Sequence, residues 1–265
     1  MNYEAAMIYE IEGLCFSYPS SESLVLNDVS LNVQEGQVMC ILGRNGVGKS
    51  TLLNCMLGLL LPQSGKLSLS GKDIKVMRER EIASVAGYVP QVISSSFSYT
   101  VMEFVLMGCA SRIGLFSKPG KRERDDAREA MRELEIEHLA DRFYTEISGG
   151  ERQKTAIARA IVSKPRVVVF DEPTAHLDYG SQLRVLRIIK SLCAQGYAVV
   201  LTTHNPDHAL LLGGKTALID SEGKLISDDT DIVVTQANLS RIYGANARLE
   251  YIESLGRMAC VFPNL

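Results

Sequence analysis

The segment GRNGVGKS, from Gly43 to Ser50, constrains the fold of this chain more than any other stretch. It fits the pattern G-x-x-x-x-G-K-[ST], and it lies between a short apolar run at 37–42 and a stretch with helical spacing at 50–60. A strand, a glycine-rich loop and a helix in this order form a phosphate loop, whose backbone N–H groups curl around a phosphate while the helix dipole adds positive potential. The pattern therefore predicts a nucleoside triphosphate site.

Individual residues of this loop have expected roles. Lys49 is expected to reach the β- and γ-phosphate oxygens, and the Ser50 hydroxyl to ligate Mg²⁺. A glycine-rich turn with an exposed lysine is the alternative interpretation, and the strand and helix on either side argue against it. The predicted nucleotide-binding residues of the segment are Gly43, Asn45, Gly46, Gly48, Lys49, Ser50 and Thr51.

A second apolar run, VVVFDEP at 167–173, ends in two acids. A buried strand here would place Asp171 and Glu172 at the carboxyl edge of a sheet, where ligands bind in such folds. We expect Asp171 to act on Mg²⁺, directly or through another ligand, and Glu172 to polarise the attacking water. A strand followed by Asp-Glu-Pro is also a common turn, and the phosphate loop is what favours the functional interpretation.

The stretch ISGGERQ at 147–153 places a serine and two glycines just before a helix that is expected to begin at Glu151. Ser148 could simply cap that helix above a flexible turn. Alternatively, the stretch is a second anion-binding helix N-terminus, suited to a γ-phosphate. Because the chain already has a phosphate loop of its own, a second such site suggests a nucleotide held by a partner.

Length, composition and charge exclude several classes of protein. The 265 residues are 46% hydrophobic and 22% charged, which is ordinary for a globular chain with a sizeable core. With a formal net charge of −3, nothing global directs the chain to nucleic acid, and we expect no nucleic-acid partner. The six cysteines form no C-x-x-C pair, so we expect reduced, mostly buried thiols rather than disulfides or a zinc site.

The apolar segments are short, and their length bears on where in the cell the chain is found. None approaches the roughly 18 residues of a membrane-spanning helix, and the first residues carry glutamates where a secretory signal would be basic and then apolar. We therefore expect a chain that stays in the cytoplasm and does not cross a bilayer by itself.

The remaining patterns organise the chain as an α/β fold. Apolar alternation around a Ser/Pro turn predicts antiparallel strands between 8 and 33. Buried strands then alternate with helices, which is typical of a parallel sheet with helices on both faces. Further strands are expected at 37–42, 66–69, 86–89, 166–170, 197–202, 215–220 and 224–227, and further helices at 50–60, 151–163 and 181–194.

The stretch from 92 to 147 differs from its surroundings, because it lacks β-branched runs and contains two helical segments, at 100–107 and 122–134. We predict that it is a helical subdomain inserted into a nucleotide-binding core made of residues 1–91 and 148–234. Residues 235–265 form a C-terminal segment with a last helix near 235–243, and no role is predicted for the end of that segment.

Taken in order, seven features of the chain resemble the full motif set of an ABC-type ATPase subunit, and the match covers nearly the whole sequence. They are Tyr18, the loop Gly43 to Ser50, Gln91, ISGGE at 147–151, VVVFDEP at 167–173, HLD at 176–178 and His204. This resemblance implies a P-loop nucleoside triphosphatase core with a mostly parallel sheet, an antiparallel β subdomain and the helical insertion. It also implies ATP and Mg²⁺ as cofactors and hydrolysis of ATP to ADP and phosphate.

The resemblance also implies roles for residues outside the phosphate loop. Tyr18 matches the aromatic residue that stacks on adenine, and Gln91 matches the glutamine that joins the ATP and Mg²⁺ site to the helical region. His204 matches the histidine that contacts the γ-phosphate, and Asp178 matches the acid of the loop that crosses the dimer interface. The catalytic set implied in this way is Lys49, Gln91, Glu172 and His204, and the expected metal ligands are Ser50, Gln91 and Asp171.

By the same resemblance, two subunits pack head to tail and hold two ATP molecules between them. Each ATP would lie between one phosphate loop and the other chain's Ser148, Gly149 and Gly150. The signature here reads ISGGE rather than the commoner LSGGQ, which puts a carboxylate at Glu151 close to a phosphate site; this variant also occurs in a subgroup of importers.

The stretches between the motifs resemble the ATPases of metal-chelate importers, which handle iron siderophores, haem, cobalamin or, in some members, molybdate or tungstate. The similar stretches are YVPQ at 88–91, FSYTVMEFVLMG at 97–108, EISGGERQ at 146–153 and DEPTAHLDYG at 171–180. The implied partners are a second copy, two permease subunits and, indirectly, a substrate-binding protein, with the chain at the cytoplasmic face of the membrane. Phe97, Val101, Phe104 and Val105 would line a groove for a permease helix, or else form an ordinary core face.

Soluble ABC ATPases are the competing class. The 56 residues from 92 to 147 are too few for the long coiled coil of the DNA-repair type, and one phosphate loop argues against the translation type, where two are expected. The cluster-assembly type stays open, as does a regulatory protein that binds nucleotide without hydrolysing it.

Overall fold

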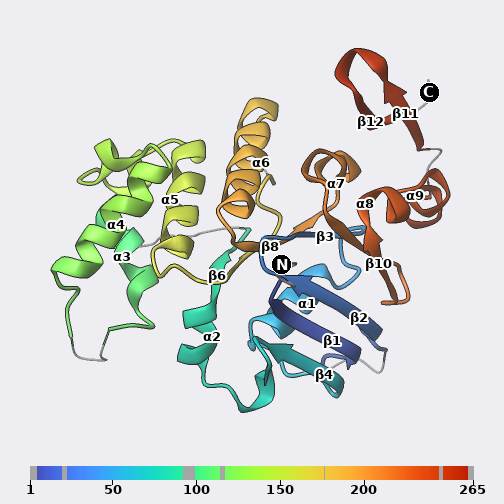
Figure 1. The fold of residues 1–265 in the computed structure, drawn as a ribbon, viewed down its shortest axis with the longest axis horizontal. Helices are drawn as coiled ribbons and strands as arrows, with labels where there is room; N and C mark the ends of the chain where they lie inside the picture. Colours follow the sequence, from blue (N-terminus) through green and yellow to red (C-terminus); the bar gives the residue numbers. More distant parts are fainter. Residues whose placement is uncertain are drawn as a thin grey trace.

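A six-stranded sheet forms the centre of the protein in the computed structural model, which describes residues 5–19, 23–91, 99–113, 117–175, 177–244 and 247–261 (Figure 1). The strand order is β10-β9-β3-β8-β7-β6, and every neighbouring pair is parallel except β10 with β9. The strands are β3 (Val38–Leu42), β6 (Ala86–Val89), β7 (Val167–Phe170), β8 (Ala198–Thr203), β9 (Lys215–Ile219) and β10 (Leu225–Asp229).

The register of this sheet brings distant motifs to one edge. Leu42, the last residue of β3, pairs with Thr203 of β8, and Phe170, the last residue of β7, pairs with Leu201. The loops that follow these three strands therefore leave the sheet side by side. All residues of β3, β7 and β8 are buried, as expected of parallel strands covered on both faces.

A smaller antiparallel sheet packs on one side of the central one, with the order β2-β1-β4-β5. Its strands are β1 (Met7–Phe16), β2 (Leu26–Gln34), β4 (Ser64–Leu69) and β5 (Lys72–Asp73). Helix α1 (Lys49–Met56) shares one apolar core with this sheet and with the facing side chains of the central sheet. The buried Tyr9 hydroxyl of β1 donates to the backbone oxygen of Met56, 2.9 Å away, which ties the end of α1 to this sheet.

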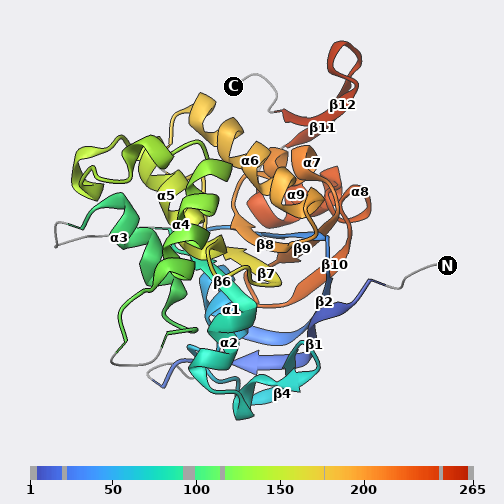
Figure 2. The ribbon, with the colours of Figure 1, turned by 60° about the vertical axis from the view of Figure 1, so that its left-hand side comes forward.

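A second apolar core covers the other face of the central sheet. Helices α5 (Gly149–Ile161), α6 (Tyr179–Ala194) and α7 (Pro206–Leu212) pack there, and α3 (Val101–Leu106) and α4 (Lys121–Glu133) extend the core into a lobe of helices beside the sheet (Figures 1 and 2). In the described ranges the chain also forms single-turn 3₁₀ helices, at Ile74–Val76, Met107–Cys109, Glu137–Leu139, Tyr144–Glu146 and Glu253–Leu255.

The C-terminal segment follows β10, which is the last strand of the central sheet along the chain. It consists of α8 (Thr230–Val233), α9 (Gln236–Tyr243) and an antiparallel hairpin of β11 (Arg248–Ile252) and β12 (Arg257–Val261). In Figures 1 and 2 this hairpin, coloured red, stands out from the body of the molecule close to α7 and α9. None of the helices in the described ranges has the length and apolarity needed to span a bilayer.

The predicted α/β architecture is confirmed, and most predicted elements are present within one or two residues. The first helix is an exception, because it ends at Met56 rather than near Leu60; Gly58, with φ of +69°, turns the chain there. The sequence interpretation missed α2 (Glu79–Val85), α7 and the β11–β12 hairpin. All six cysteines are free; three are fully buried, and Cys15, Cys193 and Cys260 are half-buried.

Candidate functional site

The glycine-rich loop joins β3 to α1, as the sequence predicts, and its shape depends on two glycines. Gly46 and Gly48 have φ of +82° and +106°, in a region that residues with side chains rarely adopt. Gly48 caps α1, and a Cβ atom there would lie 3.0 Å from the backbone oxygen of Val25. The first N–H groups of α1 have no partner within the helix, so this end is suited to an anion.

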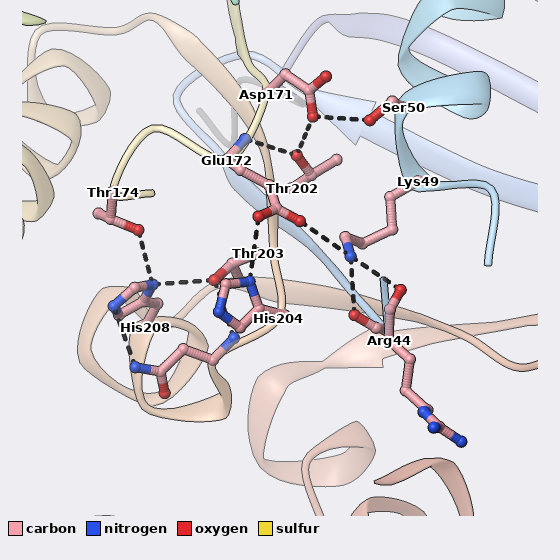
Figure 3. Close-up of polar contacts among 12 residues, drawn as sticks. Arg44, Lys49, Ser50, Asp171, Glu172, Thr174, Thr202, Thr203, His204 and His208 are labelled. Carbon is pink, nitrogen blue, oxygen red and sulfur yellow. Dashed lines mark hydrogen bonds and ion pairs between the residues drawn. The ribbon is translucent and has the colours of Figure 1, made fainter. Parts of the chain in front are cut away.

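Lys49, the first residue of α1, lies across the loop that precedes it. Its ammonium donates to the backbone oxygens of Gly43 and Arg44 at 2.9 and 3.0 Å, and it forms an ion pair with Glu172 at 3.1 Å (Figure 3). The residue is only 5% exposed. Because a buried charge is costly unless it is paired and hydrogen-bonded, these three contacts explain how the lysine is tolerated there.

Ser50 and Asp171 meet beneath the loop. The Asp171 carboxylate accepts hydrogen bonds from the Ser50 hydroxyl at 3.1 Å and from the Thr202 hydroxyl at 2.7 Å. Among the described residues no group of three or more His, Cys, Asp and Glu side chains could hold a metal. A hydroxyl and a single carboxylate still fit Mg²⁺, which prefers oxygen ligands and usually keeps waters and substrate phosphate oxygens in its shell.

Glu172 occupies a strained backbone position at the end of β7. Its φ is +43°, and its backbone N–H donates to the Thr202 hydroxyl at 2.8 Å. Its carboxylate lies between two partners, Lys49 on one oxygen and the His204 ring nitrogen Nδ1 at 3.1 Å on the other. Non-glycine residues in this region of backbone space concentrate at functional sites, where surrounding contacts hold them.

His204 follows β8, and a second histidine, His208, lies in α7, the next helix along the chain. His208 of α7 is buried, with its Nδ1 3.0 Å from the Thr203 hydroxyl and 3.5 Å from the Thr174 hydroxyl, and its Nε2 3.3 Å from the Asn205 amide (Figure 3). Burial, with a smaller effect from His204, lowers the pKa of His208 to about 4, so this ring is neutral at pH 7. Sequence reasoning missed His208, Thr202 and Thr203, although the letters TTH after a buried strand were available.

A pocket of about 440 Å³ opens above the loop and brings most of the predicted nucleotide-binding residues together. Tyr18 stands at its edge, 38% exposed, with its hydroxyl 3.1 Å from the Thr51 hydroxyl. The lining residues are Tyr18, Val25, Asn45, Gly46, Gly48, Lys49, Ser50, Thr51, Gln91 and Glu172. Seven of the predicted loop and aromatic residues, together with Gln91 and Glu172, thus face a single cavity.

The signature residues lie elsewhere in the same chain. Ser148 and Gly150 line a separate pocket of about 300 Å³ between α5 and α6. Gly149 is the first residue of α5, and Asp178 caps α6 by accepting the N–H of Ser181 at 2.9 Å. His176 of the HLD motif lies outside the described residues.

The Glu151 carboxylate is turned back onto its own helix terminus. It accepts from the Ser148 hydroxyl at 2.7 Å and from the Ser148 N–H at 2.8 Å, while the Ser148 oxygen accepts the Glu151 N–H at 3.4 Å. These bonds form a capping box and lower the pKa of Glu151. Ser148 therefore does cap the helix, and its hydroxyl is engaged by the carboxylate that the ISGGE variant introduces.

Of the two interpretations of the apolar residues in the helical lobe, the structure agrees with an ordinary core face. Val101, Phe104 and Val105 do not line a groove; all three are buried in the core, where the Phe104 ring stacks on Tyr144 with centroids 4.4 Å apart. Phe97 lies outside the described residues. A pocket of about 520 Å³ opens on another side of α3. Its lining is Arg80, Tyr99, Glu103, Leu106, Met107, Ala110, Ile113, Ser117, Lys118, Pro119 and Arg124.

The fold and the site define the class of protein. A glycine-rich loop between a buried parallel strand and a helix, a lysine folded over that loop, and a Ser50–Asp171 pair at the same sheet edge identify a P-loop nucleoside triphosphatase. The sequence model of the family described as "ABC transporter" matches residues 26–175. The chain belongs to the ABC transporter family, as an ATP-binding subunit.

Known proteins support this assignment over the whole chain. An uncharacterized ABC transporter ATP-binding protein of Haemophilus influenzae is 37% identical over 92% of this chain and 92% of its own length. The molybdate import ATP-binding protein MolC of the same species is 35% identical over 88% of this chain and 87% of its own. A solved metal-chelate type ABC transporter in an inward-facing conformation has a subunit that matches with a TM-score of 0.86 and 32% identity, covering 98% of both chains.

Proposed function

We propose that this chain is the ATP-hydrolysing subunit of an importer for a metal chelate or a metal oxyanion. The family, the molybdate-import relative and the metal-chelate type structure support this class of substrate. The observation that carries the enzymatic part is Glu172, whose carboxylate lies at the 440 Å³ pocket between Lys49 and His204.

In this proposal the pocket holds the nucleotide. Tyr18 stacks on the adenine, the loop N–H groups and Lys49 hold the phosphates, and Ser50, Asp171 and Gln91 hold Mg²⁺. The ion, when bound, offsets the negative charge of the phosphate oxygens. Glu172 accepts a hydrogen bond from the attacking water. As the new bond to the γ-phosphorus forms, the water gives a proton to Glu172 and the bond to the bridging oxygen breaks, giving ADP and phosphate, while His204 orients the γ-phosphate.

The site is completed by a second copy of the chain. Ser148 and Gly150 line a pocket separate from that of their own phosphate loop, which supports a head-to-tail dimer in which they, with Gly149 and Asp178, contact the partner's nucleotide. The proposal also keeps the predicted division of the chain. It has a nucleotide-binding core of 1–91 and 148–234, a helical subdomain of 92–147 and a C-terminal segment of 235–265.

We place the chain at the cytoplasmic face of a membrane, bound there by two permease subunits that receive substrate from a binding protein. The 520 Å³ pocket of the helical lobe suits a short permease helix, because its lining includes apolar side chains such as Leu106, Met107 and Ile113. Arg80, Lys118 and Arg124 at the same pocket suit an acidic or C-terminal helix end.

Glu172→Gln tests the catalytic part. The amide keeps the shape of the side chain but cannot polarise water as a carboxylate does, so we expect turnover to fall by at least about 100-fold while ATP is still bound. The variant should also accumulate dimer in ATP and Mg²⁺, measured by size-exclusion chromatography with light scattering. Glu222→Gln, in an exposed turn, is the matched control. Parent-like hydrolysis by Glu172→Gln would remove Glu172 from this role.

Reconstitution tests the transport part. With its permease in liposomes, the chain should hydrolyse ATP faster when loaded binding protein is present, over a panel of iron chelates, haem, cobalamin, molybdate and tungstate. Hydrolysis that no membrane protein stimulates, together with no co-purifying permease, would favour the soluble cluster-assembly class instead.

A further inference from the structure

The C-terminal segment contacts the loop that carries His204 at two points. The hydroxyl of Tyr243, the last residue of α9, donates to the backbone oxygen of His204 at 3.0 Å. Asp207, in the first turn of α7, accepts the N–H of Cys260 from β12 at 3.0 Å, and Arg257 of β12 lies 3.8 Å from the same carboxylate oxygen. Residues about 40 to 50 positions further along the chain thus hold this loop.

Tyr243 is built into the protein rather than lying on its surface. Its ring is half-buried and packs against the core that also includes Ala247, Leu249 and Cys260. Burial raises the pKa of Tyr243, and the nearby Cys260 and Glu172 add to the shift, so the hydroxyl stays protonated and remains a donor at neutral pH.

The His204 loop is held from its other side by the buried, neutral His208. That ring contacts the Thr203 hydroxyl, and Thr203 in turn accepts the N–H of Asn205 at 3.1 Å. These contacts fix the residues before and after His204. In the described part of the loop, the Tyr243 hydroxyl is the group that donates to the His204 backbone oxygen itself. This contact restrains the peptide that follows His204, and the backbone from which the imidazole reaches the Glu172 carboxylate is restrained with it.

We propose that Tyr243 is a positioning residue for His204, holding the imidazole in contact with the Glu172 carboxylate. The proposal rests on the hydrolytic role assigned above to Glu172 and His204. It gives the C-terminal segment a function: α9 and the β11–β12 hairpin fix the histidine side of the site. Tyr243 does not touch the reacting atoms and acts only through His204.

Tyr243→Phe tests this by removing the hydroxyl and leaving the ring in place. Loss of one hydrogen bond of ordinary strength should lower kcat about five- to tenfold, with the KM for ATP changed by less than about twofold and Tm within about 2 °C of the parent. Tyr251→Phe, an exposed tyrosine of β11, is the matched control and should keep the parent kcat.

A second background separates positioning from general stability. In His204→Ala, adding Tyr243→Phe should lower kcat no further, because the residue through which it acts is gone. The proposal is overturned if Tyr243→Phe keeps the parent kcat, if its effect persists in the His204→Ala background, or if its loss of activity tracks a loss of Tm. A parent protein that does not hydrolyse ATP would instead refute the proposed function, so the two failures are distinguishable.

Discussion

At the scale of single residues, the site depends on groups that the motifs do not name. Thr202 donates its hydroxyl to Asp171 and accepts the N–H of Glu172, so one side chain orients both acids. The His208 ring links the loop after β7 to the loop after β8. It contacts Thr174, two residues after Glu172, and Thr203, the residue before His204. Sequence patterns predicted residues that line the pocket, such as Lys49 and Glu172, but they did not predict Thr202 and His208, which orient the residues around it.

The buried His208 predicts a pH dependence of stability. Its pKa is about 4 in the folded protein and about 6.5 in an unfolded chain, so the unfolded state binds the proton more readily between these values. Stability is therefore complete above pH 6.5 and is lost as the pH falls toward 4. The loss amounts to about 3 kcal/mol at most.

Urea unfolding of the parent and of His208→Gln, from pH 7 to pH 4, measures this contribution. The free energy of unfolding should fall more steeply with acid in the parent than in the variant, since the variant lacks the group that titrates. His138→Gln, an exposed histidine, should follow the parent curve. Parallel curves for the parent and His208→Gln would show that the ring is not held neutral.

At the scale of elements, the start of α5 combines two tasks at Ser148. The residue caps the helix in a box with Glu151, and it is also the predicted contact to a partner's nucleotide. The Glu151 carboxylate lines the same pocket as Ser148 and is bonded to the Ser148 hydroxyl and N–H, so the ISGGE variant places a charged hydrogen-bond acceptor at this position. A nucleotide that uses the Ser148 hydroxyl would compete with Glu151 for it.

Substitution of Glu151 measures the capping contribution. Glu151→Ala removes half of the box and should lower the free energy of unfolding by about 1 kcal/mol, whereas Glu151→Gln keeps an acceptor and should cost less. Chemical denaturation gives both numbers, with Glu250→Ala on exposed β11 as the control. Equal losses for Ala and Gln would mean that the box does not stabilise α5.

Most of the sheet could be predicted because β3, β7 and β8 are continuous apolar runs bounded by turn residues. Helix α2 was missed because Ile82 is its one residue in the buried core, so it shows no apolar stripe. The β11–β12 hairpin was missed for a related reason: Ala259 is its fully buried residue, and the others are half-buried or exposed. The apolar pattern of α3 left a partner groove and a core face open, and the structure uses the face for the core, as a short helix requires.

At the scale of the whole molecule, the phosphate loop and Ser148 line separate pockets, and in the proposed head-to-tail dimer these are two half-sites carried by one chain. In such a dimer an intact half from the partner can combine with the intact half of a defective chain, as in any assembly whose sites lie between subunits.

Mixing two inactive variants tests this. Lys49→Ala damages the phosphate loop and Ser148→Arg blocks the signature half, so each alone should be inactive. A heterodimer of the two has one site in which both halves are intact. Random pairing should therefore restore about a quarter of the parent ATPase activity. A mixture of Lys49→Ala with Glu172→Gln, both on the same half, should restore none; no recovery in the first mixture would contradict the head-to-tail arrangement.

The Lys49–Glu172 ion pair has a consequence for how tightly nucleotide binds. Since the ammonium already has an anionic partner, an incoming phosphate replaces that partner instead of meeting a free cation, and the measured affinity is the difference between two attractions. Neutralising Glu172 removes the internal competitor. The substitution that stops the chemistry should therefore also make the resting protein hold its ATP more firmly.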